Sequence, residues 1–276
     1  MKKILLSLGM IVFVGAVVIG ATGAFFSDTE TSTGNTFTAG AIDLTIDSEQ
    51  HYNGNVCQFV ESDPVGQGSY QWVGNSPYPA GGTSCDGTWE ATDLGVQQFF
   101  KFNDIKPGDE GENTISLHIN NNDAWLKMII KDVTDFDNSC TEPEEGSIDT
   151  CTVSPPELLT PGAGELREAL LFSVWLDQGA IAGFQGTTDS GEGDNIRQPS
   201  TEPELISAGT IDASGETWPL PTPLLGGQTA YFGIDWSLPN TVGNETQTDS
   251  MSATMEFQVV QSRKNPTPWP LTPSTP

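Results

Sequence analysis

Apolar and polar side chains alternate with a period of two along several stretches of this chain. The most regular example is residues 251–259, where Met, Ala, Phe and Val alternate with Ser, Thr, Glu and Gln. Because successive side chains of a β-strand point to opposite faces of a sheet, such stretches predict half-buried strands. The predicted strands span residues 41–47, 97–102, 113–120, 125–133, 170–176, 230–236 and 251–259.

Long polar segments separate these strands, and we expect them to be loop insertions. Only residues 161–171 offer consecutive helix-favouring side chains, and flanking Gly and Pro keep any helix there short. Strands joined by turns rather than helices predict an all-β fold, an antiparallel β-sandwich of jelly-roll type over residues 41–264. A Pro- and Thr-rich tail, residues 265–276, follows it. The insertions span residues 51–89, 135–161 and 179–223.

The first residues have the three parts of an export signal. Lys2 and Lys3 precede an apolar stretch, residues 4–19, which ends in the small residues 20–24. This pattern predicts a signal peptide over residues 1–24, with cleavage after Ala24. The alternative is an uncleaved membrane anchor, because residues 4–26 carry no charge and are long enough to span a bilayer. Either arrangement places the rest of the chain outside the membrane, secreted or at the cell surface.

The cysteines agree with an exported protein. There are 4 of them, and an even number in an exported chain indicates disulfide bonds. Proximity in sequence favours the pairs Cys57–Cys85 and Cys140–Cys151, although other pairings remain open. Each pair would close one of the long insertions. A metal site is a weaker interpretation, because there is no Cys-x-x-Cys pair and the histidines are far apart in sequence.

The charge balance excludes two classes of partner. The chain has 10 Lys and Arg against 37 Asp and Glu, a net charge of −27. Nucleic acid would be repelled, and no basic patch is available to bind anionic lipid. The 36% of hydrophobic residues, with 7 Trp and 13 Phe, nevertheless indicate a folded domain with a sizeable core rather than a disordered acidic chain.

Three segments of the chain resemble the camelysin/TasA family of exported proteins. The first segment runs from the signal through Phe25-Phe26-Ser-Asp and the Asn-Thr-Phe-Thr-Ala-Gly-Ala-Ile-Asp-Leu stretch that ends at Leu44. The other two are the Lys-Pro-Gly-Asp turn at residues 106–109 and the Trp-Ser-Leu-Pro-Asn stretch at 236–240. The insertions carry no such likeness.

The resemblance implies a jelly-roll domain in the extracellular matrix or on the cell surface, exported with a dedicated signal peptidase as processing partner. It implies two rival functions. One is a fibre or biofilm-matrix subunit whose freed N-terminal segment adds as a strand to the next subunit, so that copies of the chain, or related surface subunits, form a filament. The other is a surface metallopeptidase.

The residues themselves argue against a peptidase. A zinc peptidase needs three protein ligands, an open position for water and a nearby Glu. This chain has only 2 His, His51 and His118, and no His-Glu-x-x-His motif. No Ser or Cys nucleophile with a nearby base is evident either. The expectation is therefore that the protein is not an enzyme.

The N-terminal segment, residues 25–40, is a candidate donor strand. It has apolar anchors at Phe25, Phe26 and Phe37, several Thr of good β-propensity and no Pro. It has few large apolar side chains in its middle. The alternative is that it forms the first edge strand of its own sandwich or remains a loose terminus.

Acidic residues in a Gly-rich loop suggest a calcium site. Calcium binds six to eight oxygen ligands in flexible loops, and the segment around residues 189–195 has that composition. It lacks the order of an EF-hand loop, and a solvated acidic loop is the alternative. Under the calcium interpretation the protein would be a monomeric surface domain. The candidate ligands are Asp177, Asp189, Glu192 and Asp194.

Overall fold

The computed structural model describes residues 27–29, 42–62, 64, 66–139, 164–266 and 268–269. The predicted signal peptide, Phe25, Phe26, Phe37, Cys140 and Cys151 lie outside the described residues.

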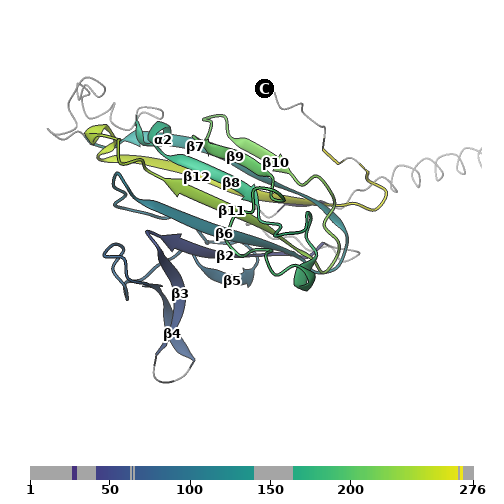
Figure 1. Cartoon of the computed structure of the whole chain (residues 1–276). Helices are drawn as coiled ribbons and strands as arrows, with labels where there is room; N and C mark the ends of the chain where they lie inside the picture. Colours follow the sequence, from purple (N-terminus) through teal and green to yellow (C-terminus); the bar gives the residue numbers. More distant parts are fainter. Residues whose placement is uncertain are drawn as a thin grey trace, which may run out of the picture.

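Two antiparallel sheets make up the described part of the molecule (Figure 1). The four-stranded sheet contains, in spatial order, β1 (Ser27–Thr29), β12 (Asp249–Gln261), β7 (Ala124–Asp137) and β10 (Glu216–Pro219). The eight-stranded sheet contains, in spatial order, β4 (Gln67–Val73), β3 (Asn55–Ser62), β2 (Leu44–Tyr52), β6 (Glu110–Ile119), β11 (Thr229–Ser237), β8 (Leu171–Leu176) and β9 (Glu204–Gly209), with β5 (Trp89–Thr92) paired to β2. The predicted fold class, an all-β antiparallel sandwich, is confirmed.

Helical structure is confined to short pieces in the described residues. These are α2 (Leu166–Ala169), η1 (Gly186–Thr188) and η2 (Asn244–Thr246). The first lies within the segment where a short helix was predicted. In the part of the chain that the structure describes, none of these helices has the length or apolar character needed to cross a membrane.

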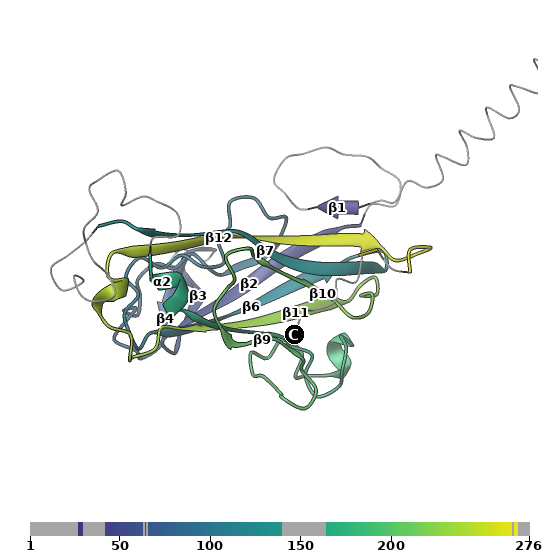
Figure 2. The same ribbon diagram turned by 90° about the horizontal axis from the view of Figure 1, so that it is seen from above.

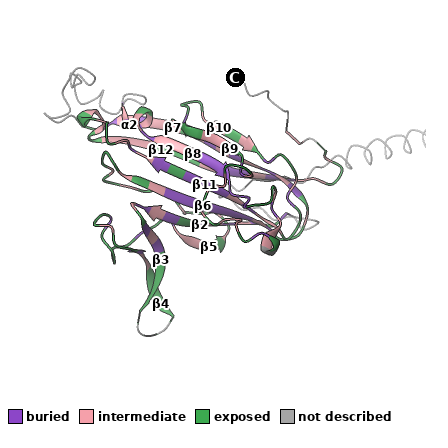
Figure 3. Cartoon of the chain, in the orientation of Figure 1, coloured by how far each residue is buried: buried purple, intermediate pink, exposed green. Residues whose placement is uncertain are grey.

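The main core lies between the sheets and follows the predicted alternation (Figure 3). On β2, Leu44 and Ile46 are buried while Thr45 and Asp47 are only partly so. The same alternation places apolar residues of β6, β7, β11 and β12 on the inner faces. Phe232 of one sheet and Phe257 of the other meet in the middle, with ring centroids 6.5 Å apart.

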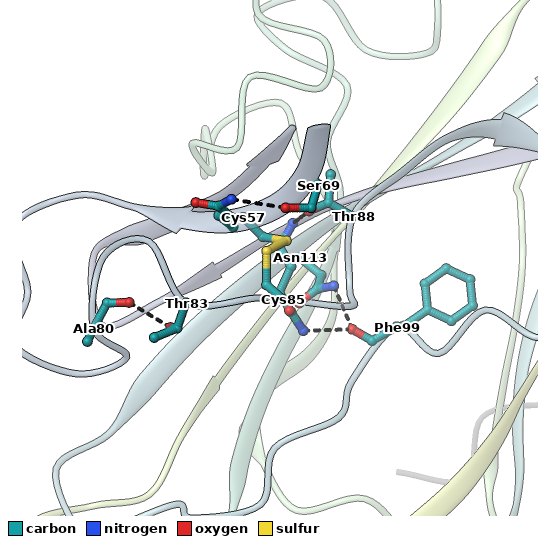
Figure 4. Close-up of a disulfide and its surroundings, with 10 residues drawn as sticks. Cys57, Ser69, Ala80, Thr83, Cys85, Thr88, Phe99 and Asn113 are labelled. Carbon is teal, nitrogen blue, oxygen red and sulfur yellow. Dashed lines mark hydrogen bonds between the residues drawn. A yellow bond between two sulfur atoms is a disulfide. The ribbon is translucent and has the colours of Figure 1, made fainter. Parts of the chain in front are cut away.

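A second apolar cluster closes one end of the eight-stranded sheet. Tyr52, Trp72 and Trp236 are its aromatic members, and the disulfide between Cys57 and Cys85 belongs to it. The two Cα atoms of that disulfide are 5.9 Å apart (Figure 4). The predicted pairing of these two cysteines is confirmed.

Strands β3 and β4 form a hairpin that extends away from the body of the sandwich (Figure 1). Beyond Cys57 most of its residues are exposed (Figure 3). The prediction of a loop insertion over residues 51–89 was therefore wrong at this hairpin. A ribbon exposed on both faces needs no apolar alternation, so the sequence pattern gave no signal for it. Strands β9 and β10 likewise lie within the predicted insertion 179–223.

The predicted strand over residues 97–102 is also wrong, because these residues form no strand. Phe99 is nevertheless buried in the main core. Its backbone carbonyl accepts hydrogen bonds from Gln50 Nε2 at 3.0 Å and Asn113 Nδ2 at 2.9 Å. Side-chain amides of the neighbouring strands thus replace the strand ladder at this position (Figure 4).

Candidate functional site

Part of the N-terminal segment pairs with β12 (Figure 2). Strand β1 runs antiparallel to β12, with Ser27 opposite Val260, Asp28 opposite Val259 and Thr29 opposite Gln258. Without β1, β12 would be the edge strand of the four-stranded sheet, and its outward N–H and C=O groups would lack a ladder partner. The structure therefore places the strand-forming part of this segment on its own sheet.

The edge of β12 is suited to strand pairing over only part of its length. Its register with β7 shifts between Ser252 and Thr254, which marks a β-bulge or irregularity. Such irregularities interrupt a ladder and discourage edge-to-edge pairing. Beyond the irregularity, Phe257 and Val259 point into the core and hold this half of the strand in place. The regular part of the edge is the part that β1 occupies.

An ion pair between a buried carboxylate and a partly exposed lysine lies on the outer face of the same sheet. Glu256 is 5% exposed and pairs with Lys131 of β7. Burial disfavours the ionised carboxylate, but hydrogen bonds from Lys131 and Gln258 outweigh this and lower the pKa of Glu256. This pair fixes β12 against β7 directly beside the register of β1.

The acidic loop after β8 is held together by its own carboxylates. Asp177 accepts hydrogen bonds from the backbone N–H groups of Gly193 and Asn195, at 3.1 and 3.0 Å. Asp189 accepts in the same way from Ile181 and Gly191, at 2.6 and 3.1 Å. Carboxylates that accept local N–H bonds stabilise turns, in the manner of Asx turns and helix caps.

Other carboxylates of the loop have similar roles. Glu192 accepts from the N–H groups of Gln185 and Gly186, and Glu202, 2% exposed, accepts from Gly179 at 2.7 Å. Asp194 accepts from the N–H of Ile196 at 2.9 Å. The carboxylates of the loop are therefore bound to backbone N–H groups of the same loop.

The predicted calcium ligands do not form one ligand set. Within the described residues, no group of three or more His, Cys, Asp or Glu is placed to hold a metal ion. Asp177, Asp189, Glu192 and Asp194 lie in one loop but bind different backbone N–H groups. The sequence signal, Asp and Glu next to Gly, is shared by calcium loops and by carboxylate-capped turns, so composition alone could not separate the two.

Asp177 is the deepest of these groups, with no exposed surface. Burial raises the pKa of Asp177 to about 7, against the opposing hydrogen bond from Asn195, and the nearby Glu202 carboxyl raises it further. Near neutral pH the Asp177 carboxyl therefore retains a proton for part of the time.

Both histidines lie on the outer face of the eight-stranded sheet, each beside a carboxylate. His51 Nε2 is 3.0 Å from Glu49 Oε1, and His118 Nε2 is 2.7 Å from Asp47 Oδ2. His118 Nδ1 also contacts Thr229 Oγ1 at 2.9 Å. Glu112 of β6 lies opposite His51 of β2. Because Glu112 and His118 are six residues apart on the same strand, the two histidines are separated by about 20 Å along the sheet. The two histidines thus cannot share a ligand.

The same face carries a row of polar residues, of which the sequence analysis had considered only His51. Strand pairing places His51, Glu112, Asp235 and Ser173 side by side on β2, β6, β11 and β8. Glu112 and Asp235 are directly opposite each other, and like charges in that position are destabilising. Each acidic residue is ordinary on its own strand, so only the register between distant strands reveals the row.

No family model, curated protein or solved structure matches this chain. The geometry of the β12 edge and of the acidic sheet face is therefore the basis for assigning function.

Proposed function

We propose that this protein is a secreted structural subunit of cell-surface fibres or extracellular matrix, assembled by addition of its N-terminal segment to a neighbouring subunit. The observation that carries the proposal is the antiparallel pairing of β1 with the edge of β12. The same backbone groups can accept the same segment from a second copy, because the ladder is made of main-chain hydrogen bonds.

The connection between β1 and the sandwich permits such an exchange. Residues 30–41 link β1 to Ile42, and an extended chain spans at most about 3.6 Å per residue, roughly 40 Å here. A segment on a tether of this length can occupy the edge of its own chain or of a neighbour, as in domain swapping.

Transfer of the segment to the next copy would produce a filament. The donor is the N-terminal segment and the acceptor is the β12 edge, so the contact joins two different surfaces. Contacts of this heterologous kind do not close on themselves unless the rotation between copies forms a ring. The resemblance to the camelysin/TasA family supports the same function, as does the absence of Pro from residues 25–40.

The other two functions considered have less support. A surface metallopeptidase and a monomeric calcium-binding domain both need a set of metal ligands. The described residues contain no group of three or more His, Cys, Asp or Glu suited to that purpose. Neither function accounts for the pairing of the N-terminal segment with the sheet edge.

The decisive experiment asks whether β1 crosses between chains. Two single variants, Thr29→Cys and Gln258→Cys, are prepared separately from the chain beginning at Phe25, mixed and mildly oxidised. These positions lie opposite each other in the register, within the Cα separation that a disulfide spans. Strand exchange predicts a disulfide-linked pair containing one chain of each variant.

The matched control replaces Gln258→Cys by Gln261→Cys, three positions further along β12 and outside the register of β12 with β1. It should give no linked pair. Electron microscopy of the same chain beside a truncation that begins at Gly40 tests assembly directly. Filaments are expected only from the longer chain. Monomers from both chains, together with no mixed disulfide, would rule out the proposed assembly.

A further inference from the structure

The outer face of the eight-stranded sheet is hollowed where the acidic residues meet. Two adjoining hollows of about 450 and 470 Å³ share His51 in their linings. We call them together the acidic groove. Its lining contains no Lys or Arg among the described residues, and its carboxylates come from β2, β6, β11 and the loop after β8. They are Asp47, Glu49, Glu110, Glu112, Asp194 and Asp235.

Glu112 gives this groove a feature that an acidic surface alone lacks. The residue is only 8% exposed, and its Oε2 atom is buried without a hydrogen-bond partner in the described part of the chain. Its other oxygen, Oε1, accepts from Thr114 Oγ1 at 3.3 Å. Oε2 lies 4.0 Å from His51 Nδ1. A buried carboxyl oxygen without a partner is costly, whether the group is protonated or ionised, and it points to a partner that the described part of the chain does not provide.

The missing partner should be a cationic donor, and the Glu112 carboxyl would lose its proton on binding it. Asp235 lies opposite Glu112 and is exposed, and Glu49 is exposed on the neighbouring strand. Carboxylates at several sides of one hollow favour a positively charged donor, which forms hydrogen bonds stronger than neutral ones. The nearest basic residue in sequence to the lining, Arg197, already pairs with Glu204 at 3.1 Å.

Among the residues that the structure describes, one pair of neighbouring side chains offers such a group. Among the described residues, Lys101, Lys106, Lys131, Arg167 and Arg197 all form ion pairs. Lys127 lies over the ring of Trp269, with Nζ 4.1 Å from the centroid.

The remaining two, Arg263 and Lys264, are exposed, and neither has an ion pair within the described residues. They form the tip of a tight turn after β12, closed by a hydrogen bond from the N–H of Asn265 to the carbonyl of Ser262 at 2.9 Å. Asn265 O in turn accepts from Trp125 Nε1 at 2.8 Å. The two cationic side chains are thus presented on a fixed support.

We propose that the acidic groove binds the basic turn, Arg263–Lys264, of a second copy of this chain. The groove lies on the eight-stranded sheet and the turn follows β12 of the other sheet, so the contact joins two different surfaces and is compatible with a filament. Copies with a net charge of −27 repel one another, and this contact sets the basic turn, which has no ion pair within the described residues, against the acidic groove. The inference rests on the proposed assembly function for its partner.

The first test uses a peptide and does not require assembly. The probe is acetyl-Ser-Arg-Lys-Asn-amide, titrated into the chain beginning at Phe25 by isothermal calorimetry. A peptide this small should bind with a dissociation constant on the order of 1 mM. Glu112→Gln and Asp235→Asn should each weaken binding at least about fivefold, since each removes a charged acceptor. The matched control, Glu61→Gln on the exposed hairpin, should leave binding unchanged.

A second readout separates a direct contact from a structural role of Glu112. Burial, followed by the charge of Asp235, raises the pKa of Glu112 to about 9, and Asp177 and Glu49 raise it further. A bound cation stabilises the ionised form, so peptide binding at pH 7 should release protons to the buffer. Calorimetry in two buffers of different ionisation enthalpy measures this release, which Glu112→Gln should abolish. The other groups facing Glu112 are His51 and Thr114.

The source of the cation is tested by zero-length carbodiimide crosslinking of ¹⁴N- and ¹⁵N-labelled chains mixed before assembly. Links of mixed isotope between Lys264 and Glu49 or Asp235 are expected. Lys101 and Asp86, 3.0 Å apart, provide the control and should link only within one chain.

Failure of this inference and failure of the assembly proposal have different signatures. Filaments without peptide binding would contradict the proposal that the acidic groove binds the basic turn. Peptide binding that is insensitive to Glu112→Gln and Asp235→Asn would contradict it as well. Displacement of the peptide by stoichiometric calcium would also overturn it, in favour of a divalent cation. If the peptide binds normally but no filaments form, the assembly proposal is contradicted, and so is a second copy as the source of the basic turn. The groove would then still be a site for a basic group.

Discussion

Buried carboxyl groups make the stability of this protein depend on pH. Burial is the main cause that raises the pKa of Glu112 to about 9 and that of Asp249 to about 7. Asp249 nevertheless accepts hydrogen bonds from the N–H groups of Glu165 and Leu166, at 2.6 and 3.0 Å, and so anchors the start of α2. Both groups are therefore more easily ionised in the unfolded chain than in the folded one.

The sign of the pH effect follows from this difference. Above its ordinary pKa of 4.5, Glu112 loses its proton in the unfolded chain but keeps it in the folded chain up to about pH 9. The contribution of Glu112 to the free energy of unfolding is therefore most favourable below about pH 4 to 5. It becomes less favourable as the pH rises toward 9.

Glu112→Gln should remove this loss and raise the free energy of unfolding at pH 8 by on the order of a few kcal/mol. Urea unfolding at pH 5 and pH 8 measures it, with Glu61→Gln as the control. An unchanged pH slope in the Glu112 variant would contradict the assignment.

Gly233 is required by the ring of Trp175. A Cβ atom at this position would overlap the indole, which is 1% exposed and has no space to move. Gly233→Ala should therefore destabilise the fold by about 1–3 kcal/mol, the usual cost of overpacking. Thermal unfolding measures the change. Gly95→Ala is the matched control, because its Cβ would lie at an ordinary 3.7 Å from Gln97 Oε1. Equal melting temperatures for the two variants would be inconsistent with this account.

At the residue scale, the sequence could identify inward and outward positions but not their partners. The alternation in residues 41–47 correctly separates buried Leu44 and Ile46 from Thr45 and Asp47. Glu112 belongs to an outward position of its strand, yet it is buried, and the residues around it come from β2, β8 and β11. No local pattern contains that information, since strands distant in sequence supply the contacts.

At the element scale, the disulfide is a constraint on the second cluster and the hairpin. Cys57 and Cys85 close a loop with a sequence separation of 28 and lie beside Trp72. Replacing both by Ala should lower the free energy of unfolding by about 3 kcal/mol, because the unfolded chain regains loop entropy. The urea midpoint of this variant checks the prediction. The corresponding double variant of Cys140 and Cys151 serves as comparison. A midpoint equal to that of the native protein would show that the bond adds no stability.

Strands that cross the core were predictable, and strands that leave it were not. Residues 251–259 carry the clearest alternation and form the central part of β12. The β3–β4 hairpin lacks a buried face beyond Cys57, so its sequence resembles a loop. Residues 97–102 show the opposite error, because their sequence predicted a strand and they form none. Phe99 is apolar because it fills the core, while Gln50 and Asn113 bind its carbonyl in place of a neighbouring strand.

At the scale of the whole molecule, the charge of −27 opposes the folded state. Carboxylates brought together by folding repel one another, and dissolved salt screens this repulsion over about 10 Å at 0.1 M. The free energy of unfolding should therefore rise between 10 mM and 0.5 M NaCl. Urea unfolding measures it, and choline chloride in place of NaCl controls for specific binding of sodium. A stability that falls with salt would show that attractive pairs dominate.

The pairing of β1 with β12 has a consequence for growth. If the segment is passed from copy to copy, every filament has a direction, with a free N-terminal segment at one tip and a vacant β12 edge at the other. A synthetic peptide of residues 25–36 would fill the vacant edge and act as a chain terminator at that tip alone. Small amounts of it should shorten filaments while leaving the opposite tip able to elongate.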